Sequence, residues 1–288
     1  TRKIKLGAQV DLEQVAQLTT GFSGADLANL CNEAALAATR RGADEVSVDD
    51  FTVAVERIVP GTGSSELIAR LTAWVARGGG RTVWLPPEAY GDYAHAAAQW
   101  RLARVTEPQH ADLAWCCTPS SPRGLAEPTP LATLREARVP ALDRAYEPLR
   151  LSGTAPPATQ CEEAWQLWSP NKALGLTGVR GAYAIAPAGA EAQAAELNDM
   201  AASWPLGAHA VALLMAWTDP DTQRWLHNSR AQLRDWKAAQ TALLQSLGWT
   251  CLPSEANYFC ARAPAALDTP ALRAQGIKLR DTTSLGLP

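Results

Sequence analysis

The spacing of apolar residues divides the chain into two parts that meet near residue 60. In residues 1–60, apolar positions recur at helical spacing and polar residues interrupt them. Ser23 with Asp26, and Ser47 with Asp50, each place a hydroxyl residue three positions before a carboxylate, which is the spacing of a capping box at a helix start. The pattern predicts short helices that pack on one another, with no long flexible linker after them.

Beyond residue 61 the pattern changes to short apolar runs that alternate with longer helical stretches. Such runs, separated by segments long enough for a crossover, are typical of a mostly parallel sheet covered by helices on both faces. We therefore expect an α/β fold with three parts: a helical domain at 1–60, a large domain at 61–190 and a partial, smaller domain at 191–288. The expected strands are 81–87, 112–117, 138–143, 164–169 and 181–186, with a late one at 257–262.

Composition and charge narrow the classes of partner. The chain has 288 residues, of which 47% are hydrophobic and 19% charged, so we expect packed cores rather than disorder. Its net charge of −3 provides no basic surface for nucleic acid or for an anionic membrane. The longest apolar run, residues 206–217, is too short to cross a bilayer, and no signal-peptide pattern opens the chain. These features predict a cytoplasmic protein that binds neither nucleic acid nor a membrane.

Cysteine and histidine patterns argue against a metal site. The six cysteines form no CxxC pair and the four histidines no HExxH motif. We expect neither a zinc site nor a framework of disulfides.

The strongest chemical signal lies in WSPNKALGLTGVRG, residues 168–181. Lys172 follows a strand-like run and precedes a glycine-rich turn, with Ser169 three residues before it and Arg180 eight after it. A lysine held among apolar neighbours loses its proton more readily and can attack a carbonyl to form a Schiff base. By residue type alone a surface lysine in a loop is the commoner explanation. The order of its neighbours instead favours a lysine that forms a Schiff base.

This order resembles the cofactor-lysine motif of fold-type I pyridoxal-phosphate enzymes, the superfamily of aspartate aminotransferase. The resemblance implies that Lys172 forms the Schiff base with pyridoxal 5'-phosphate, and that Ser169 and Arg180 bind the cofactor phosphate. A hydroxyl donor and a guanidinium suit a dianionic phosphate. The fold that it implies is PLP-transferase-like, with a mostly parallel sheet and helices on both faces.

Two further segments follow in the order of that family. PALDRAYEPLRL resembles its D-x-A-Y strand end, which implies Asp143 against the pyridine nitrogen and Tyr146 near the ring hydroxyl. PPEAYGDYAHAA resembles the segment whose aromatic ring stacks on the cofactor, which implies that role for Tyr90. Each residue alone has a structural alternative, since aspartate is common at strand-end turns and tyrosine in cores.

The ends of the second part also resemble this family. GTGSSELI resembles the glycine-rich turn and helix start that receive the phosphate, where Gly63, Ser64 and Ser65 would offer backbone donors. The ending GIKLRDTTSLGLP resembles the histidinol-phosphate aminotransferase and threonine-phosphate decarboxylase branch, which implies Arg280 at the substrate's phosphate or carboxylate. A solvated arginine is the alternative.

The chain departs from the family pattern on the substrate side. TPSSPRG places Ser121 where the family has an asparagine that binds the ring oxygen, and Arg123 where it has threonine. Serine is shorter, so we expect that contact to be lost or bridged by water. The family's N-terminal arm and its last strand have no counterpart here, so we expect an incomplete substrate side.

Residues 1–60 resemble the helical lid of an AAA ATPase, in particular the FtsH zinc proteases, with GFSGADLANL as the core of the match. In that family Gly24 and Ala25 would lie against the nucleotide. The phosphate-binding loop GxxxxGK[ST] is absent, so we expect no productive ATP binding. The chain is therefore expected to join two unrelated fragments.

The second resemblance implies an enzyme that transfers an amino group between an amino acid or phosphorylated amine and a 2-oxo acid, working as a homodimer. Two alternatives stay open. One is a decarboxylase of the threonine-phosphate type, because the same cofactor serves both reactions. The other is a non-catalytic fragment that only binds the cofactor or a partner.

Overall fold

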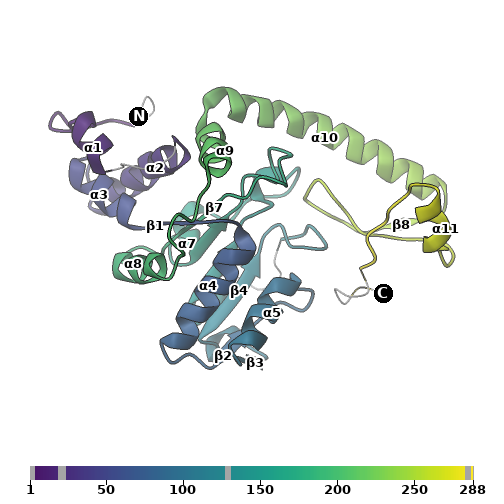
Figure 1. Ribbon diagram of the computed structural model, residues 1–288. Helices are drawn as coiled ribbons and strands as arrows, with labels where there is room; N and C mark the ends of the chain where they lie inside the picture. The colour runs from purple at the N-terminus through teal and green to yellow at the C-terminus, as the bar shows by residue number, and fades with distance from the viewer. Residues whose placement is uncertain (1–3, 19–23, 127–130, 283–286, 288) are drawn as a thin grey trace.

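A computed structural model describes residues 4–18, 24–126, 131–282 and 287 (Figure 1). The first part is helical, as its apolar spacing predicts. Ser47 accepts a hydrogen bond from the backbone N–H of Asp50, whose side chain accepts one from the backbone of Ser47, so this capping box is confirmed. Ser23, the other expected cap, lies outside the described residues. The helices are α1 (Leu12–Leu18), α2 (Gly24–Arg40) and α3 (Val48–Glu56).

The centre of the molecule is a seven-stranded sheet in the order β1-β7-β6-β5-β4-β2-β3. Neighbouring strands are parallel except at β7, which runs antiparallel to both β6 and β1. The mostly parallel α/β sheet is confirmed, and each of the five runs expected in the large domain contains a strand. These strands are β2 (Thr82–Trp84), β4 (Leu113–Cys117), β5 (Pro140–Asp143), β6 (Trp165–Trp168) and β7 (Ala182–Ile185).

Both edges of the sheet are strands that the apolar pattern does not predict. Only Arg57 separates β1 (Ile58–Gly61) from the end of α3, so the chain passes from the helical part into the sheet without a linker. β3 (Ala103–Val105) forms the other edge beside β2. The late strand is shorter than the pattern predicts: only β9 (Ala261–Arg262) forms, paired with β8 (Thr250–Cys251).

Helices cover both faces of the sheet, so its central strands are buried on both sides. Leu113 and Trp115 of β4 pack on one face, under α4 (Ser64–Arg77), α5 (Gly91–Gln99) and α8 (Glu191–Asp199). Ala114 and Cys116 face the other side, under α6 (Leu131–Leu134) and α7 (Ala158–Cys161). Successive side chains of β4 point to opposite faces, so this one strand contributes to two hydrophobic cores.

The N-terminal helices share a hydrophobic core with the sheet. Buried residues of α2 and α3 belong to one cluster with β7 and α9 (Ala208–Thr218), and α2 packs directly on α9. The first 60 residues therefore cover apolar surface of the rest of the chain. The buried residues that form this shared cluster include Leu30, Phe51, Tyr183, Ile185, Leu214 and Trp217.

A long helix, α10 (Pro220–Ser246), runs in Figure 1 from α9 across to the β8–β9 hairpin and α11 (Thr269–Ala274). Asp219 caps its start by accepting hydrogen bonds from the backbone N–H groups of Asp221 and Thr222. The segment after β8 returns to the loop that follows β4, where the N–H of Glu255 donates to the carbonyl of Gly124 over 2.6 Å. Among the described residues, no helix has both the length and the apolar character of a membrane span.

Candidate active site

A cavity of about 170 Å³ opens where the parallel strands end. Asp143 is the last residue of β5, Cys117 the last of β4, and Lys172 lies in the turn that follows β6. Ligand sites of open α/β sheets lie at this carboxyl edge. All the site residues inferred from the sequence line this cavity except Gly63 and Arg280. Its lining is Ser64, Ser65, Tyr90, Cys117, Ser121, Asp143, Ala145, Tyr146, Ser169, Asn171, Lys172, Thr177 and Arg180.

Lys172 is half-buried, with its amine directed to Ser169. Its Nζ donates to Ser169 Oγ over 3.3 Å and lies 5.5 Å from the centroid of the Tyr146 ring. Burial lowers the pKa of Lys172 below its ordinary value, and the opposing attraction of Asp143 is smaller. A larger fraction of this amine is therefore neutral and nucleophilic than in a solvated lysine.

A short chain of hydrogen bonds fixes the turn that carries this lysine. Ser169 Oγ donates to Asn171 Oδ1 over 2.8 Å, and Asn171 Nδ2 donates to the carbonyl of Val179 over 3.1 Å. Both Ser169 and Asn171 are buried. Asn171 thus ties the start of the turn to its end, and no sequence pattern had singled it out.

Asp143 is a buried carboxylate that is held from two sides. Tyr93 donates its hydroxyl to Asp143 Oδ2 over 2.7 Å, and the backbone N–H of Ala145 donates to Oδ1 over 2.9 Å. Burial raises the pKa of Asp143, against the lowering effect of these two bonds and of Lys172. An anion in this position is poorly solvated, so a cationic ligand group beside it would be strongly favoured.

Tyr93 is a site residue that the sequence does not reveal. Its ring is fully buried and stacks on Trp115 with centroids 4.7 Å apart and an angle of 7°. Burial raises the pKa of Tyr93 well above its ordinary value, so its hydroxyl remains a donor. The one sequence feature that pointed to Tyr93 was its position three residues after Tyr90, on the first turn of α5.

Aromatic rings form two walls of the cavity. Tyr90 meets Tyr93 edge-to-face at 5.7 Å. Tyr146 meets Tyr258 in the same way at 4.8 Å, and burial raises the pKa of Tyr146 to about 12. Tyr258 in turn donates its hydroxyl to the carbonyl of Ser120 over 2.8 Å. The segment before β9 therefore packs against Tyr146, which lines the cavity.

One end of the cavity is suited to an anion. The helix α4 starts at Ser64 without a side-chain cap, so its first backbone N–H groups remain available as donors. A β-carbon at Gly63 would lie 2.2 Å from Arg180 Nη2, so only glycine allows the guanidinium to lie against this turn. The buried Ser64 Oγ has no hydrogen-bond partner within the protein. Together Arg180, Ser64 and the helix start concentrate positive charge and donors at one point.

Arg280 lies away from this cavity. It is exposed, and it lines neither cavity described here. It follows α11 near the end of the chain, beyond the β8–β9 hairpin. The expectation that Arg280 contacts a substrate is therefore not supported by its position.

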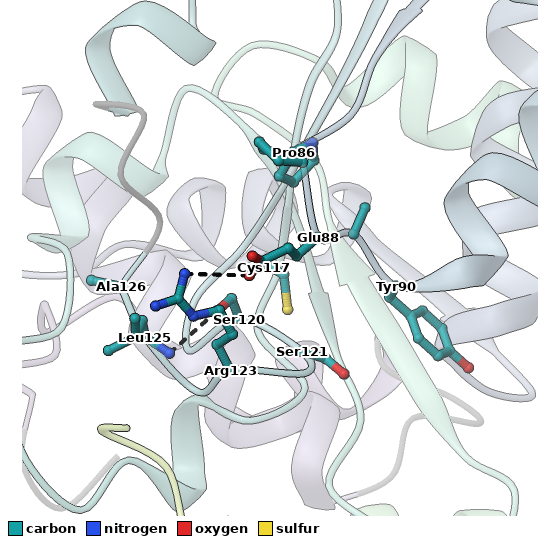
Figure 2. A pocket seen from close by; sticks show the side chains of 11 residues that line it. Pro86, Glu88, Tyr90, Cys117, Ser120, Ser121, Arg123, Leu125 and Ala126 are labelled. Atoms are coloured by element: carbon teal, nitrogen blue, oxygen red, sulfur yellow. Dashed lines mark hydrogen bonds and ion pairs between the residues drawn. The ribbon is translucent and has the colours of Figure 1, made fainter. Parts of the chain in front are cut away.

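A second cavity of about 230 Å³ adjoins the first (Figure 2). The two share Tyr90, Cys117 and Ser121 as lining residues. Figure 2 shows Arg123 pointing to Glu88, with Arg123 Nη1 and Glu88 Oε2 3.4 Å apart. Of the two departures from the family pattern, Ser121 lies at the boundary of the two cavities, and Arg123 lines the second cavity alone. Within residues 4–18, 24–126, 131–282 and 287, no three metal-ligating side chains form a cluster.

Comparison with known proteins separates the same two parts of the chain. The model of the AAA+ lid domain matches residues 9–53. The FtsH ATP-dependent zinc metalloprotease of Methylibium petroleiphilum is 64% identical over 59 residues, which are 20% of this chain and 10% of that protein. The chain thus spans about a tenth of the length of this relative.

Solved structures match nearly the whole chain at low identity, which shows the fold. Histidinol-phosphate aminotransferase from Sinorhizobium meliloti, in complex with pyridoxal-5'-phosphate, has a TM-score of 0.64 and 18% identity, covering 94% of this chain and 75% of that one. L-threonine-O-3-phosphate decarboxylase from Porphyromonas gingivalis has a TM-score of 0.65 and 15% identity, covering 99% and 90%. The model of aminotransferase class I and II matches residues 109–285, more than half of the chain. The chain therefore belongs to the aminotransferase class I and II family, with an AAA+ lid-like segment at its start.

Proposed function

We propose that the chain binds pyridoxal 5'-phosphate beside Lys172 and transfers an amino group between an amino acid or phosphorylated amine and a 2-oxo acid. One observation carries the proposal. A half-buried amine of lowered pKa, a buried carboxylate and a helix start without a side-chain cap line a single cavity. These are the groups that a cofactor with an aldehyde, a basic ring nitrogen and a phosphate requires.

The donor set fits the cofactor at each end. Arg180, the hydroxyls of Ser64 and Ser169, and the N–H groups of Ser64 and Ser65 would hold the phosphate. The buried, unpartnered Ser64 Oγ gives this fit a specific basis, since a buried hydroxyl without a partner is costly.

The ring would lie among the remaining residues of the cavity. Asp143 would hold the pyridine nitrogen in its protonated form, Tyr146 would bind the ring hydroxyl, and Tyr90 would stack on the ring. Ser121 stands in for the family's asparagine. When bound, the cofactor supplies an electron sink for the bonds at the substrate's reacting carbon.

Lys172 has two tasks in this proposal. Its neutral amine would be the group that attaches the cofactor, and the lowered pKa of Lys172 favours that neutral form. Its free Nζ would also act as the base that takes the proton from the substrate's reacting carbon and later returns it. Ser169 steadies the amine through the 3.3 Å hydrogen bond.

The lid-like segment has a structural role in this proposal. Residues 1–60 cover part of the core through α2 and α3, whereas residues 61–190 supply the cavity and 191–288 the covering helices and hairpin. Membership of the family also supports a homodimer.

The test is to add pyridoxal phosphate to the purified full chain and record its absorbance. Wild type should develop the red-shifted band of lysine-bound cofactor, and Lys172→Ala should not. Lys237→Ala is the matched control, because burial also lowers the pKa of Lys237 although it lies outside the cavity. Identical spectra for wild type and Lys172→Ala would overturn the proposal.

Product analysis then separates the reactions. An amino acid and a 2-oxo acid should exchange their amino group. Release of carbon dioxide without exchange would show a decarboxylase, and cofactor binding without either product would show a non-catalytic fragment.

A further inference from the structure

The cavity of Figure 2 contains a charged pair to which the proposed reaction assigns no role. Arg123 and Glu88 face each other in it, and its other walls are largely apolar, with Pro86, Pro87 and Leu125 among them. Since it shares Tyr90, Cys117 and Ser121 with the cavity of Lys172, a molecule with its amine at Lys172 can extend into it past these residues. A volume of about 230 Å³ holds the few heavy atoms of a small acidic group.

Arg123 has unused capacity to bind an anion. The 3.4 Å separation from Glu88 is longer than the 2.7–2.9 Å that is typical of a charged hydrogen bond. The buried Nε of Arg123 has no hydrogen-bond partner within the protein. A guanidinium offers five N–H donors in a planar fork, so Arg123 can grip a carboxylate or phosphate from two of them.

Other arginines near the site are already engaged. Arg180 lies against Gly63 at the phosphate end of the first cavity. Arg150 bonds Glu147, Glu255 and Thr118. Among the described residues that line either cavity, Arg123 and Arg180 are the only arginines, so Arg123 is the one that remains for a second anion.

We infer that Arg123 binds the acidic group of the substrate, a carboxylate or a phosphate ester, and that Glu88 is the counter-ion which this group displaces. The inference rests on the proposed function, because it presumes a substrate amine at Lys172. Glu88 then acts as a filter. It neutralises Arg123 in the empty site and repels incoming anions. Only an anion that accepts hydrogen bonds from two N–H groups of the guanidinium overcomes this repulsion.

The experiment titrates non-reacting anions into the cofactor-loaded full chain by calorimetry. Succinate probes the carboxylate, propyl phosphate probes the phosphate, and succinamide is the neutral control. Arg123→Gln should weaken binding about ten-fold or more, since a hydrogen-bonded charge is lost. Glu88→Gln should tighten it by up to about five-fold, because a partly exposed ion pair no longer competes. Arg138→Gln is the matched control: Arg138 forms one ion pair, with Asp112 at 3.6 Å, and lines neither cavity.

The outcomes separate this inference from the proposed function. Cofactor loading is read first, by absorbance; a chain that does not load overturns both. If it loads, equal affinity in wild type and Arg123→Gln overturns the inference alone. Should Arg123→Gln fail to fold, Glu88→Gln decides, and unchanged or weaker anion binding in that variant contradicts the inference. Preference for succinate or for propyl phosphate assigns the acid as carboxylate or phosphate.

Discussion

Tyr93→Phe removes one oxygen from the centre of the site and should alter the energetics of Asp143. The phenylalanine ring keeps the stack on Trp115, so the loss is confined to the 2.7 Å hydrogen bond to Asp143 Oδ2. Both residues are buried, and a hydrogen bond to a charged group contributes about 1.5–3 kcal/mol. We expect the free energy of unfolding of the cofactor-free protein to fall by about that amount at pH 8.

The effect should depend on pH with a definite sign. Burial raises the pKa of Asp143 above the value of about 3.9 that it has in the unfolded chain. Between these two pKa values the unfolded state releases its proton first, so stability falls as pH rises and then levels off above the folded pKa. Losing the Tyr93 hydroxyl raises the folded pKa further. The destabilisation by Tyr93→Phe should therefore be smaller at pH 4 than at pH 8.

A double-mutant cycle in urea measures this coupling. With Asp143→Asn the partner is neutral, and the same hydroxyl should contribute about 1 kcal/mol. Tyr90→Phe is the control, because the hydroxyl of Tyr90 interacts with Ser65 and Asp92 rather than bonding Asp143. The reasoning is refuted if Tyr93→Phe costs the same with and without the Asp143 carboxylate, or the same at both pH values.

Two predictions concern the N-terminal helices. Arg41, by its side-chain hydrogen bond, holds the pKa of Asp50 at about 2, so this carboxylate stabilises the fold above the unfolded pKa of about 3.9 and ceases to do so as pH falls towards 2. Asp50→Asn should cost about 1–2 kcal/mol in urea unfolding at pH 7 and progressively less below pH 4; a constant cost would contradict the linkage. Phe51→Ala should cost about 3–5 kcal/mol and shift tryptophan fluorescence and far-UV circular dichroism together, since Phe51 is fully buried in the shared core. Val53→Ala on the exposed side of α3 should cost less than about 0.5 kcal/mol, and two separate transitions in Phe51→Ala would show that the helices fold independently.

The central strands could be predicted because burial on both faces makes them continuous apolar runs. β3 has no such run, since it forms an edge and two of its three residues are exposed. β1 is short, contains Pro60 and directly follows a helix. The antiparallel direction of β7 was also not predictable from apolar runs. The segment between β6 and β7 carries the lysine turn instead of a crossover helix, and a parallel pair needs such a crossover.

The shared core of the N-terminal helices shows another limit. The sequence identifies α2 and α3 as amphipathic, but an apolar face does not say which surface it will meet. Two resemblances to unrelated families predicted a fusion of two fragments but did not say whether the fragments pack on each other. The structure brings Leu30 and Phe51 into one cluster with Ile185 and Trp217. Which surfaces pack together depends on their complementary shapes, and the spacing of apolar residues along the sequence does not reveal those shapes.

The candidate site was predictable where a motif fixes the order of residues, as at Lys172, Asp143 and the turn before α4. Tyr93 and Asn171 could not be found in this way, because they act by orienting a neighbour through a hydrogen bond. Arg280 is the opposite case. The resemblance in sequence implied that it contacts the substrate, whereas the structure leaves it exposed and outside the cavity.

Reductive trapping tests the central claim most directly. The full chain is incubated with pyridoxal phosphate, reduced with borohydride, digested and mapped by mass spectrometry. The chain has five lysines, Lys3, Lys5, Lys172, Lys237 and Lys278, and of the four that the structure describes, from Lys5 onward, only Lys172 lines the cavity. We predict near-stoichiometric labelling of Lys172, lost when the phosphate site is weakened by Arg180→Gln. Labelling spread over the other lysines, or equal labelling of Lys237 and Lys172, would contradict the account.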